Sequence, residues 1–176
     1  ASMAGAHPQL LRAVMEINRD MRRLVLQKVR AQLGSIENRT IGVLGLAFKP
    51  NTDDLREAPA IEIIHLLQSE GARVKAFDPA ATENARQVLP GVDLCSNAYE
   101  VAEDADALLL LTHWSEFRRL DLRRIREQMR RPVVIDGRNF YDPGEMAELG
   151  FVYHPIGRPR PGTIAEHDEE LVATSP

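Results

Sequence analysis

An apolar run that changes abruptly into a polar loop constrains this sequence more than any other feature. Residues 42–47 (Gly-Val-Leu-Gly-Leu-Ala) are apolar, and the loop that follows carries Phe48, Lys49 and Arg56 before a helix begins at Pro59. Near-continuous apolar runs are typical of strands buried on both faces of a parallel sheet, and proline is favoured at the first helical position. The segment therefore predicts a strand–loop–helix unit. Its loop would lie at the carboxyl edge of a parallel sheet, where open α/β folds bind ligands.

The rest of the chain continues this alternation. We expect further strands at 73–77, 93–96, 105–112, 132–136 and 151–153, and helices at 59–70, 82–89, 99–104, 122–129 and 143–149. Strands joined through helices require right-handed crossovers and form a parallel sheet with helices on both faces. The sequence therefore predicts an α/β fold with a Rossmann-like, doubly wound parallel sheet in the usual strand order 3-2-1-4-5.

A long helix is predicted ahead of the sheet, over residues 8–33, with Pro8 in its first turn and Gly34 just past its end. Five of its apolar residues alternate spacings of four and three, as in a coiled-coil seam: Leu10, Val14, Ile17, Met21 and Leu24. Further apolar residues lie beside that seam, so the apolar surface is wider than one stripe. We expect this helix to bridge to a second domain or a second subunit, with packing on its own domain alone as the simpler alternative.

Composition divides the chain into four segments. Residues 1–6 are mostly small and are expected to be a remnant of cloning. Residues 7–34 hold the long helix, and residues 35–158 form the Rossmann-like domain. Residues 159–176 are acidic and lack periodicity, so we expect a disordered tail.

Charge and composition exclude several classes of protein. The formal charge of −4 at pH 7 gives no indication of a nucleic-acid partner. No segment is long and apolar enough for a membrane span, and the N-terminus has no signal-peptide pattern. The single cysteine, Cys95, excludes a disulfide framework and a cysteine-based zinc site, and we expect it to be an inert structural thiol. These features favour a cytoplasmic protein without a metal site.

Three predicted loops meet at the carboxyl edge of the sheet, after its first, fourth and fifth strands. Loops on either side of the topological switch point open away from each other and leave a crevice. The residues expected there combine cations with aromatic rings: Phe48, Lys49, Arg56, His113, Trp114, Arg138 and Tyr141. Cations can hold phosphates through charge-assisted hydrogen bonds while a ring packs against a base or sugar, which suits a nucleotide diphosphate.

Simpler interpretations apply to several side chains. Trp114 and Tyr141 are expected to pack in the core, and Arg138 could instead form an ion pair with Asp136 or Asp142. Four arginines of the long helix are expected to form a solvated face: Arg19, Arg22, Arg23 and Arg30.

The loop after the first strand also carries features that oppose a standard dinucleotide site. It lacks the Gly-x-Gly-x-x-Gly turn, and bulky Phe48 and Lys49 stand where a pyrophosphate would approach the backbone. NAD is therefore not expected to bind to this domain in the standard manner. Asp53 and Asp54 would repel a phosphate, so we expect them to orient Lys49 or Arg56, or to accept hydrogen bonds from loop amides.

Four motifs occur in a set order. They are Ala-Val-Met-Glu-Ile-Asn-Arg at 13–19, Gly-Leu-Ala-Phe-Lys-Pro-Asn-Thr-Asp-Asp-Leu-Arg-Glu-Ala-Pro at 45–59, Gly-Ala-Arg-Val-Lys-Ala-Phe-Asp-Pro at 71–79 and Asp-Gly-Arg-Asn at 136–139. Together they resemble the C-terminal, UDP-binding domain of the UDP-glucose/GDP-mannose dehydrogenase family, over residues 8–158. Residues 112–118 and 136–142 are most similar to bacterial UDP-glucose 6-dehydrogenases. GDP-mannose and UDP-N-acetylmannosamine dehydrogenases are the alternatives.

The resemblance implies roles for particular residues. Phe48, Lys49 and Arg138 would contact a UDP-sugar, and Arg56 would reach toward NAD bound mainly by an N-terminal domain that this sequence does not contain. The helix at 8–33 would join the two domains and build a homodimer. Enzymes of this family oxidise the C6 alcohol of the sugar to a carboxylate in two NAD-dependent steps, through a thiohemiacetal on a cysteine.

The function expected from this resemblance is nucleotide-sugar binding within an NAD-dependent UDP-glucose 6-dehydrogenase, which converts UDP-glucose to UDP-glucuronate. Alone, the chain is expected to be inactive and to contain no catalytic residue, because the NAD domain and the catalytic cysteine precede it. A free-standing nucleotide-binding or assembly module is the alternative.

Overall fold

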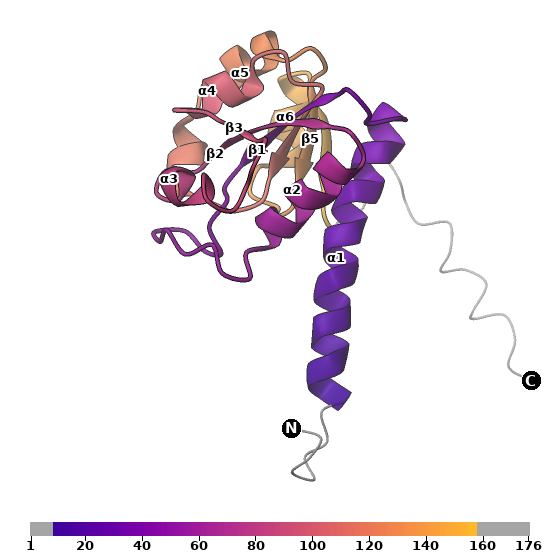
Figure 1. Ribbon diagram of the computed structural model, residues 1–176. Helices are drawn as coiled ribbons and strands as arrows, with labels where there is room; N and C mark the ends of the chain where they lie inside the picture. The colour runs from indigo at the N-terminus through magenta and orange to yellow at the C-terminus, as the bar shows by residue number, and fades with distance from the viewer. Residues whose placement is uncertain (1–8, 158–176) are drawn as a thin grey trace, which may run out of the picture.

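Six parallel strands form the sheet in the computed structural model, which describes residues 9–157 (Figure 1). The strands are β1 (Thr40–Leu44), β2 (Arg73–Phe77), β3 (Asp93–Leu94), β4 (Ala107–Leu110), β5 (Val133–Asp136) and β6 (Val152–Pro155). Their spatial order is β3-β2-β1-β4-β5-β6. The predicted order 3-2-1-4-5 is therefore confirmed, with β6 added beside β5. The expected cloning remnant (1–6) and disordered tail (159–176) lie outside the described residues.

Helices pack around these strands, and α4, α5 and α6 begin at a capping side chain. They are α1 (Gln9–Leu33), α2 (Pro59–Ser69), α3 (Thr82–Ala85), α4 (Ala98–Ala102), α5 (Leu122–Gln128) and α6 (Pro143–Glu148). The side chains of Asn97, Asp121 and Asp142 accept hydrogen bonds from the first free amides of α4, α5 and α6. A short 3-10 helix, Ser115–Arg119, stands where we expected a loop.

Two apolar cores lie on opposite faces of the sheet, because successive strand residues point to opposite sides. On one face, α1 and α2 pack against side chains that include Ile41 and Val43 of β1. On the other, α4, α5 and α6 pack against side chains that include Leu44 of β1 and Leu110 of β4. The central strands are thus buried on both faces, as their apolar sequence predicted.

The first strand is shorter than its apolar run. It ends at Leu44 rather than at Ala47 because Gly45 adopts a positive φ of 87°. A Cβ on Gly45 would lie 2.6 Å from the backbone nitrogen of Thr112. Glycine therefore lets the chain turn off the strand directly against the end of β4.

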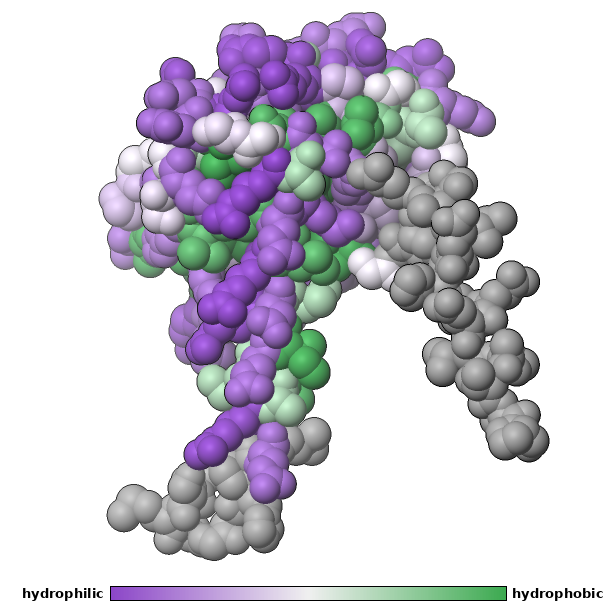
Figure 2. All heavy atoms as spheres, turned by 90° about the vertical axis from the view of Figure 1, so that its right-hand side faces the viewer, coloured by the Kyte–Doolittle hydropathy of each residue, from purple (hydrophilic) through white to green (hydrophobic). Residues whose placement is uncertain are grey.

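The two halves of α1 have different surroundings. Val25, Leu26, Val29 and Leu33 are buried against the domain. The other half extends beyond the domain (Figure 1) and carries apolar side chains that are 41–60% exposed: Val14, Met15, Ile17 and Met21. Figure 2 shows apolar side chains along this extension. Packing on its own domain therefore accounts for only half of the helix. Among residues 9–157, no helix combines the length and apolarity needed to cross a membrane.

Two arginines of α1 form ion pairs, whereas the sequence predicted that they would belong to a solvated face. The Arg22 guanidinium lies 2.7 Å from the carboxylate of Glu62, and Arg30 forms a two-pronged pair with Glu70. The hydrogen bond to Glu70 raises the pKa of Arg30. Both acidic partners flank or belong to α2, so these pairs attach α1 to α2 at two levels.

Candidate functional site

A groove of about 890 Å³ lies at the carboxyl edge of the sheet, between α1 and α2. Its walls come from α1, from the loop after β1, from the first turns of α2 and from the residues that follow β4 and β5. The strand order reverses between β1 and β4, so this groove occupies the topological switch point. The loops after β1 and β5 meet there, as the sequence expected, but the expected loop 112–117 does not line the groove, and Leu111 is the residue after β4 that does. The contribution of α1 was not foreseen.

The expected ligand-contacting residues divide into two groups. Phe48 and Arg138 line the groove, and Phe48 is 51% exposed, which is far more than a core aromatic ring. Lys49 is exposed on the same loop without lining the groove. The side chain of Arg56 is 89% exposed and borders a second, smaller depression of about 480 Å³ instead. The structure thus brings Phe48 and Arg138 together and leaves the other two cations on the loop surface.

Arg138 is fixed by the backbone around it. Its Nε donates to the carbonyl of Leu111 at 2.6 Å, and its amide donates to the carboxylate of Asp136 at 2.8 Å. Burial lowers the pKa of Arg138, while the charge of Asp136 raises it. Among residues 9–157 no carboxylate lies within ion-pair distance of the guanidinium, so the alternative interpretation, an ion pair with Asp136 or Asp142, is wrong. A guanidinium held through Nε presents its remaining N–H groups to an anion in the groove.

The carboxylate of Asp136 holds the loop that carries Arg138. Besides the Arg138 amide, it accepts hydrogen bonds from the amides of Phe140 and Tyr141 and from the hydroxyl of Tyr153. Tyr141 is structural, as expected, because its hydroxyl donates to the carbonyl of Phe117 at 2.8 Å. Burial raises the pKa of Tyr141. The loop is therefore shaped before any ligand arrives.

The acidic residues of the loop after β1 are also structural. Asp54 accepts hydrogen bonds from the Arg56 amide and from its guanidinium at 2.7 and 2.9 Å, which lowers the pKa of Asp54 to about 2. Asp53 accepts a hydrogen bond from the Asn84 amide group at 3.0 Å. The expectation that Asp54 orients Arg56 is confirmed. No cluster of three potential metal ligands occurs among residues 9–157.

A buried carboxylate that the sequence analysis missed lies beneath this loop. Asp78 is 1% exposed, and its Oδ2 accepts hydrogen bonds from the amides of Leu46 and Ala47 at 2.8 and 3.0 Å. The indole of Trp114 donates to the same oxygen at 3.0 Å, so Trp114 is a core residue, as expected, and does not face the crevice. His113 is exposed and does not line the groove. The only sequence signal for Asp78 was its place directly after β2.

The amides held by Asp78 bear on NAD binding. Leu46 and Ala47 occupy the turn after β1, where the amides of a glycine-rich turn receive a pyrophosphate. Here a protein carboxylate takes both amides, and its negative charge would repel a phosphate. The residues present do not fit a standard dinucleotide site on this domain, in agreement with the sequence analysis.

Cys95 is buried, as expected for a structural thiol. Burial, followed by the charge of Asp93, raises the pKa of Cys95 from 9.0 to about 11.

The native thiolate fraction of Cys95 near pH 8 is then about 100-fold lower than for a free thiol, and burial slows attack by the thiolate further. We expect Ellman's reagent to label the native protein slowly and the urea-unfolded protein rapidly. Equal rates in both states would contradict an inert thiol.

The fold and the groove define a class: a doubly wound α/β domain whose ligand groove lies at the switch point and lacks a glycine-rich dinucleotide turn. Residues 42–143, more than half of the chain, match the UDP binding domain of the UDP-glucose/GDP-mannose dehydrogenase family. The chain belongs to this family.

The relatives are dehydrogenases of nucleotide sugars. The chain is 45% identical over 160 residues to UDP-glucose 6-dehydrogenase TuaD of Bacillus subtilis (strain 168), covering 90% of this chain and 35% of that protein. It is also 45% identical over 152 residues to the UDP-glucose 6-dehydrogenase of Rhizobium meliloti (strain 1021), covering 86% and 35%. The chain thus spans about a third of the length of these relatives.

Solved structures agree with this assignment. The UDP-glucose dehydrogenase of Pyrobaculum islandicum superposes with a TM-score of 0.74 at 34% identity, over 87% of this chain and 33% of that one. The UDP-D-ManNAc dehydrogenase of Pyrococcus horikoshii gives a TM-score of 0.73 at 29% identity, over 89% and 35%.

Proposed function

We propose that this chain is the UDP-sugar-binding domain of an NAD-dependent UDP-glucose 6-dehydrogenase. The observation that carries the proposal is the groove at the switch point, where Phe48 and Arg138 face the same space. The identity to UDP-glucose 6-dehydrogenases from two bacteria supports the choice of substrate.

Each site residue has a proposed task in holding the ligand. The fixed guanidinium of Arg138 binds a phosphate, and the exposed ring of Phe48 packs against the uracil or a sugar. Lys49 lies next to Phe48 and adds a mobile positive charge from the loop surface. Asp54 bonds to Arg56 and Asp53 to Asn84, so Lys49 and Arg138 remain available to the diphosphate.

The parent reaction needs a second domain. NAD accepts hydride from C6 of the sugar, and we propose that it binds mainly to a domain outside this chain, with Arg56 reaching toward it. The part played by this chain is to bind and orient the nucleotide end of the substrate. Alone it would catalyse nothing.

The sugar is the least constrained part of the proposal. A UDP-D-ManNAc dehydrogenase superposes almost as well as a UDP-glucose dehydrogenase, with TM-scores of 0.73 and 0.74. The same domain of a UDP-N-acetylmannosamine enzyme is therefore the second candidate.

Calorimetric titration with UDP, UDP-glucose, GDP and NAD tests the function directly. We expect UDP and UDP-glucose to bind, and GDP and NAD to bind weakly or not at all. Binding of NAD without UDP would overturn the proposal. Preference for GDP over UDP would move the chain to the GDP-mannose branch of the family.

We further propose that α1 assembles two copies of the chain into a homodimer. Its extended half exposes Val14, Met15, Ile17 and Met21, which a soluble helix would normally cover. Ile17→Asp should reduce the mass measured by light scattering to that of a monomer, because a charge cannot be buried unpaired in an apolar seam. Gln27→Asp, which adds the same charge at an exposed position of α1, should leave the mass unchanged. A wild-type monomer would contradict this assembly.

A further inference from the structure

We propose that Asp78 is the positioning residue of the ligand loop, and that it sets the backbone from which Phe48 and Lys49 extend. The inference rests on the proposed function, because it concerns the groove assigned to the UDP-sugar. Asp78 itself lies outside that groove and would not touch the ligand.

Five hydrogen bonds converge on this one buried carboxylate. Oδ2 accepts from the amides of Leu46 and Ala47 at 2.8 and 3.0 Å and from the indole of Trp114 at 3.0 Å. Oδ1 accepts from the amides of Ala80 and Ala81 at 3.0 and 2.9 Å. These donors fill the acceptor sites of an ionised carboxylate, which is the condition for burying one at tolerable cost.

The donors belong to three separate loops. Leu46 and Ala47 follow β1, Ala80 and Ala81 follow β2, and Trp114 follows β4. A further hydrogen bond, which does not involve Asp78, also joins two of these loops, because the hydroxyl of Thr112 donates to the carbonyl of Ala47 at 2.6 Å. Asp78 therefore joins the loops on both sides of the switch point at the two residues that immediately precede Phe48.

The bonds to Asp78 set the direction in which Phe48 points. Leu46 and Ala47 have their amides turned inward, so the chain leaves the sheet in one direction and Phe48 emerges into the groove. If asparagine replaced Asp78, its NH2 group would face backbone or indole N–H donors, and the turn would rearrange. Displacements of about 1 Å at a binding loop are enough to weaken ligand contacts.

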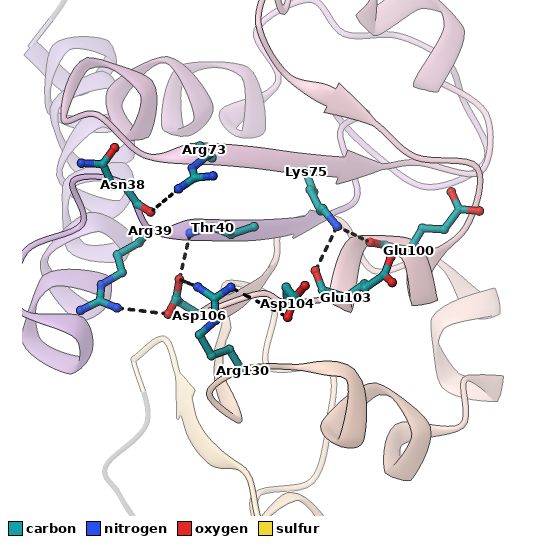
Figure 3. Close-up of polar contacts among 10 residues, drawn as sticks. All are labelled: Asn38, Arg39, Thr40, Arg73, Lys75, Glu100, Glu103, Asp104, Asp106 and Arg130. Atoms are coloured by element: carbon teal, nitrogen blue, oxygen red, sulfur yellow. Dashed lines mark hydrogen bonds and ion pairs between the residues drawn. The ribbon is translucent and has the colours of Figure 1, made fainter.

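A second buried aspartate provides a matched control. Asp106 is 0% exposed and accepts hydrogen bonds from the Thr40 amide at 3.0 Å and from Arg39 and Arg130 at 3.4 and 3.5 Å. Figure 3 shows this cluster at the start of β1, at the amino edge of the sheet. Asp78 and Asp106 are thus alike in burial and lie at opposite edges, although Asp106 accepts from two arginines and Asp78 from amides and an indole.

The experiment compares Asp78→Asn with Asp106→Asn by amide hydrogen exchange and by UDP titration. Both variants should lose stability. Only Asp78→Asn should accelerate exchange at Leu46, Ala47 and Phe48, and only it should weaken UDP binding, each by at least about tenfold. Equal losses of affinity in the two variants, or unchanged loop exchange in Asp78→Asn, would overturn the inference.

A milder variant covers the case in which Asp78→Asn does not fold. Trp114→Phe keeps a ring in the core and removes one of the five donors, so the same loop amides should exchange faster by a smaller factor. Unchanged exchange in this variant would also count against the inference. If the wild type binds no UDP, the proposed function fails, and the exchange measurements still decide whether Asp78 positions the loop.

Discussion

Gly45→Ala is expected to destabilise the domain by about 2–5 kcal/mol, the largest stability effect that we expect from a single methyl group here. Two costs add. The positive φ of 87° is unfavourable for any residue with a Cβ. In addition, the new Cβ would meet the backbone of Thr112 at 2.6 Å, and backbone cannot rotate aside as a flexible side chain can. Urea denaturation followed by circular dichroism measures the change.

Gly34→Ala is the matched control for this prediction. Gly34 has a φ of 73°, and a Cβ there would meet nothing within 4 Å. Only the backbone cost remains, which is about 1–2 kcal/mol. If the two variants lose the same stability, the contact with Thr112 contributes nothing and the tight turn off β1 is not enforced by packing.

Arg138→Ala is expected to weaken UDP binding by about 1–3 kcal/mol, or roughly fivefold to 150-fold. The reason is that the Arg138 guanidinium is already held by Leu111, so little conformational entropy is lost when a phosphate binds. Lys49→Ala should have the smaller effect within that range, because its side chain is exposed and does not line the groove. Isothermal titration with UDP gives both values.

Arg123→Ala is the appropriate comparison, since Arg123 is an exposed arginine on α5 and does not line the groove. Its affinity for UDP should equal that of the wild type. Unchanged affinity in both Arg138→Ala and Lys49→Ala would contradict binding of the diphosphate in this groove. A greater loss for Lys49→Ala than for Arg138→Ala would show that the loop closes over the ligand.

Much of the architecture could be predicted because the relevant signals are local. The apolar runs and the helical segments between them predict a doubly wound sheet, and the usual strand order of that fold places the loops after β1, β4 and β5 at one edge. Phe48 and Arg138 could therefore be assigned to one crevice although they lie far apart in the sequence. The bulky turn after β1 likewise predicted that a dinucleotide would not fit.

The remainder depends on contacts that no local pattern reports. The sequence shows Asp78 only as the residue after a strand. Its structural role depends on the amides of Leu46 and Ala47, which belong to the loop of a different strand. The apolar spacing of α1 is similar along its length, yet Val29 is buried and Ile17 is 60% exposed, because the domain covers only one half. Arg22 was misjudged for the same reason, since its partner Glu62 lies on another helix.

Strand β1 pairs with two strands that lie at very different distances along the chain. Its register with β2 joins Thr40 to Arg73, but its register with β4 joins Ile41 to Ala107. During synthesis, one edge of β1 therefore stays unpaired until the residues of β4 have been made. Unpaired strand edges favour association between nascent chains. Pairing over this separation in sequence is also slow. We therefore expect β1–β4 pairing to set the pace of refolding.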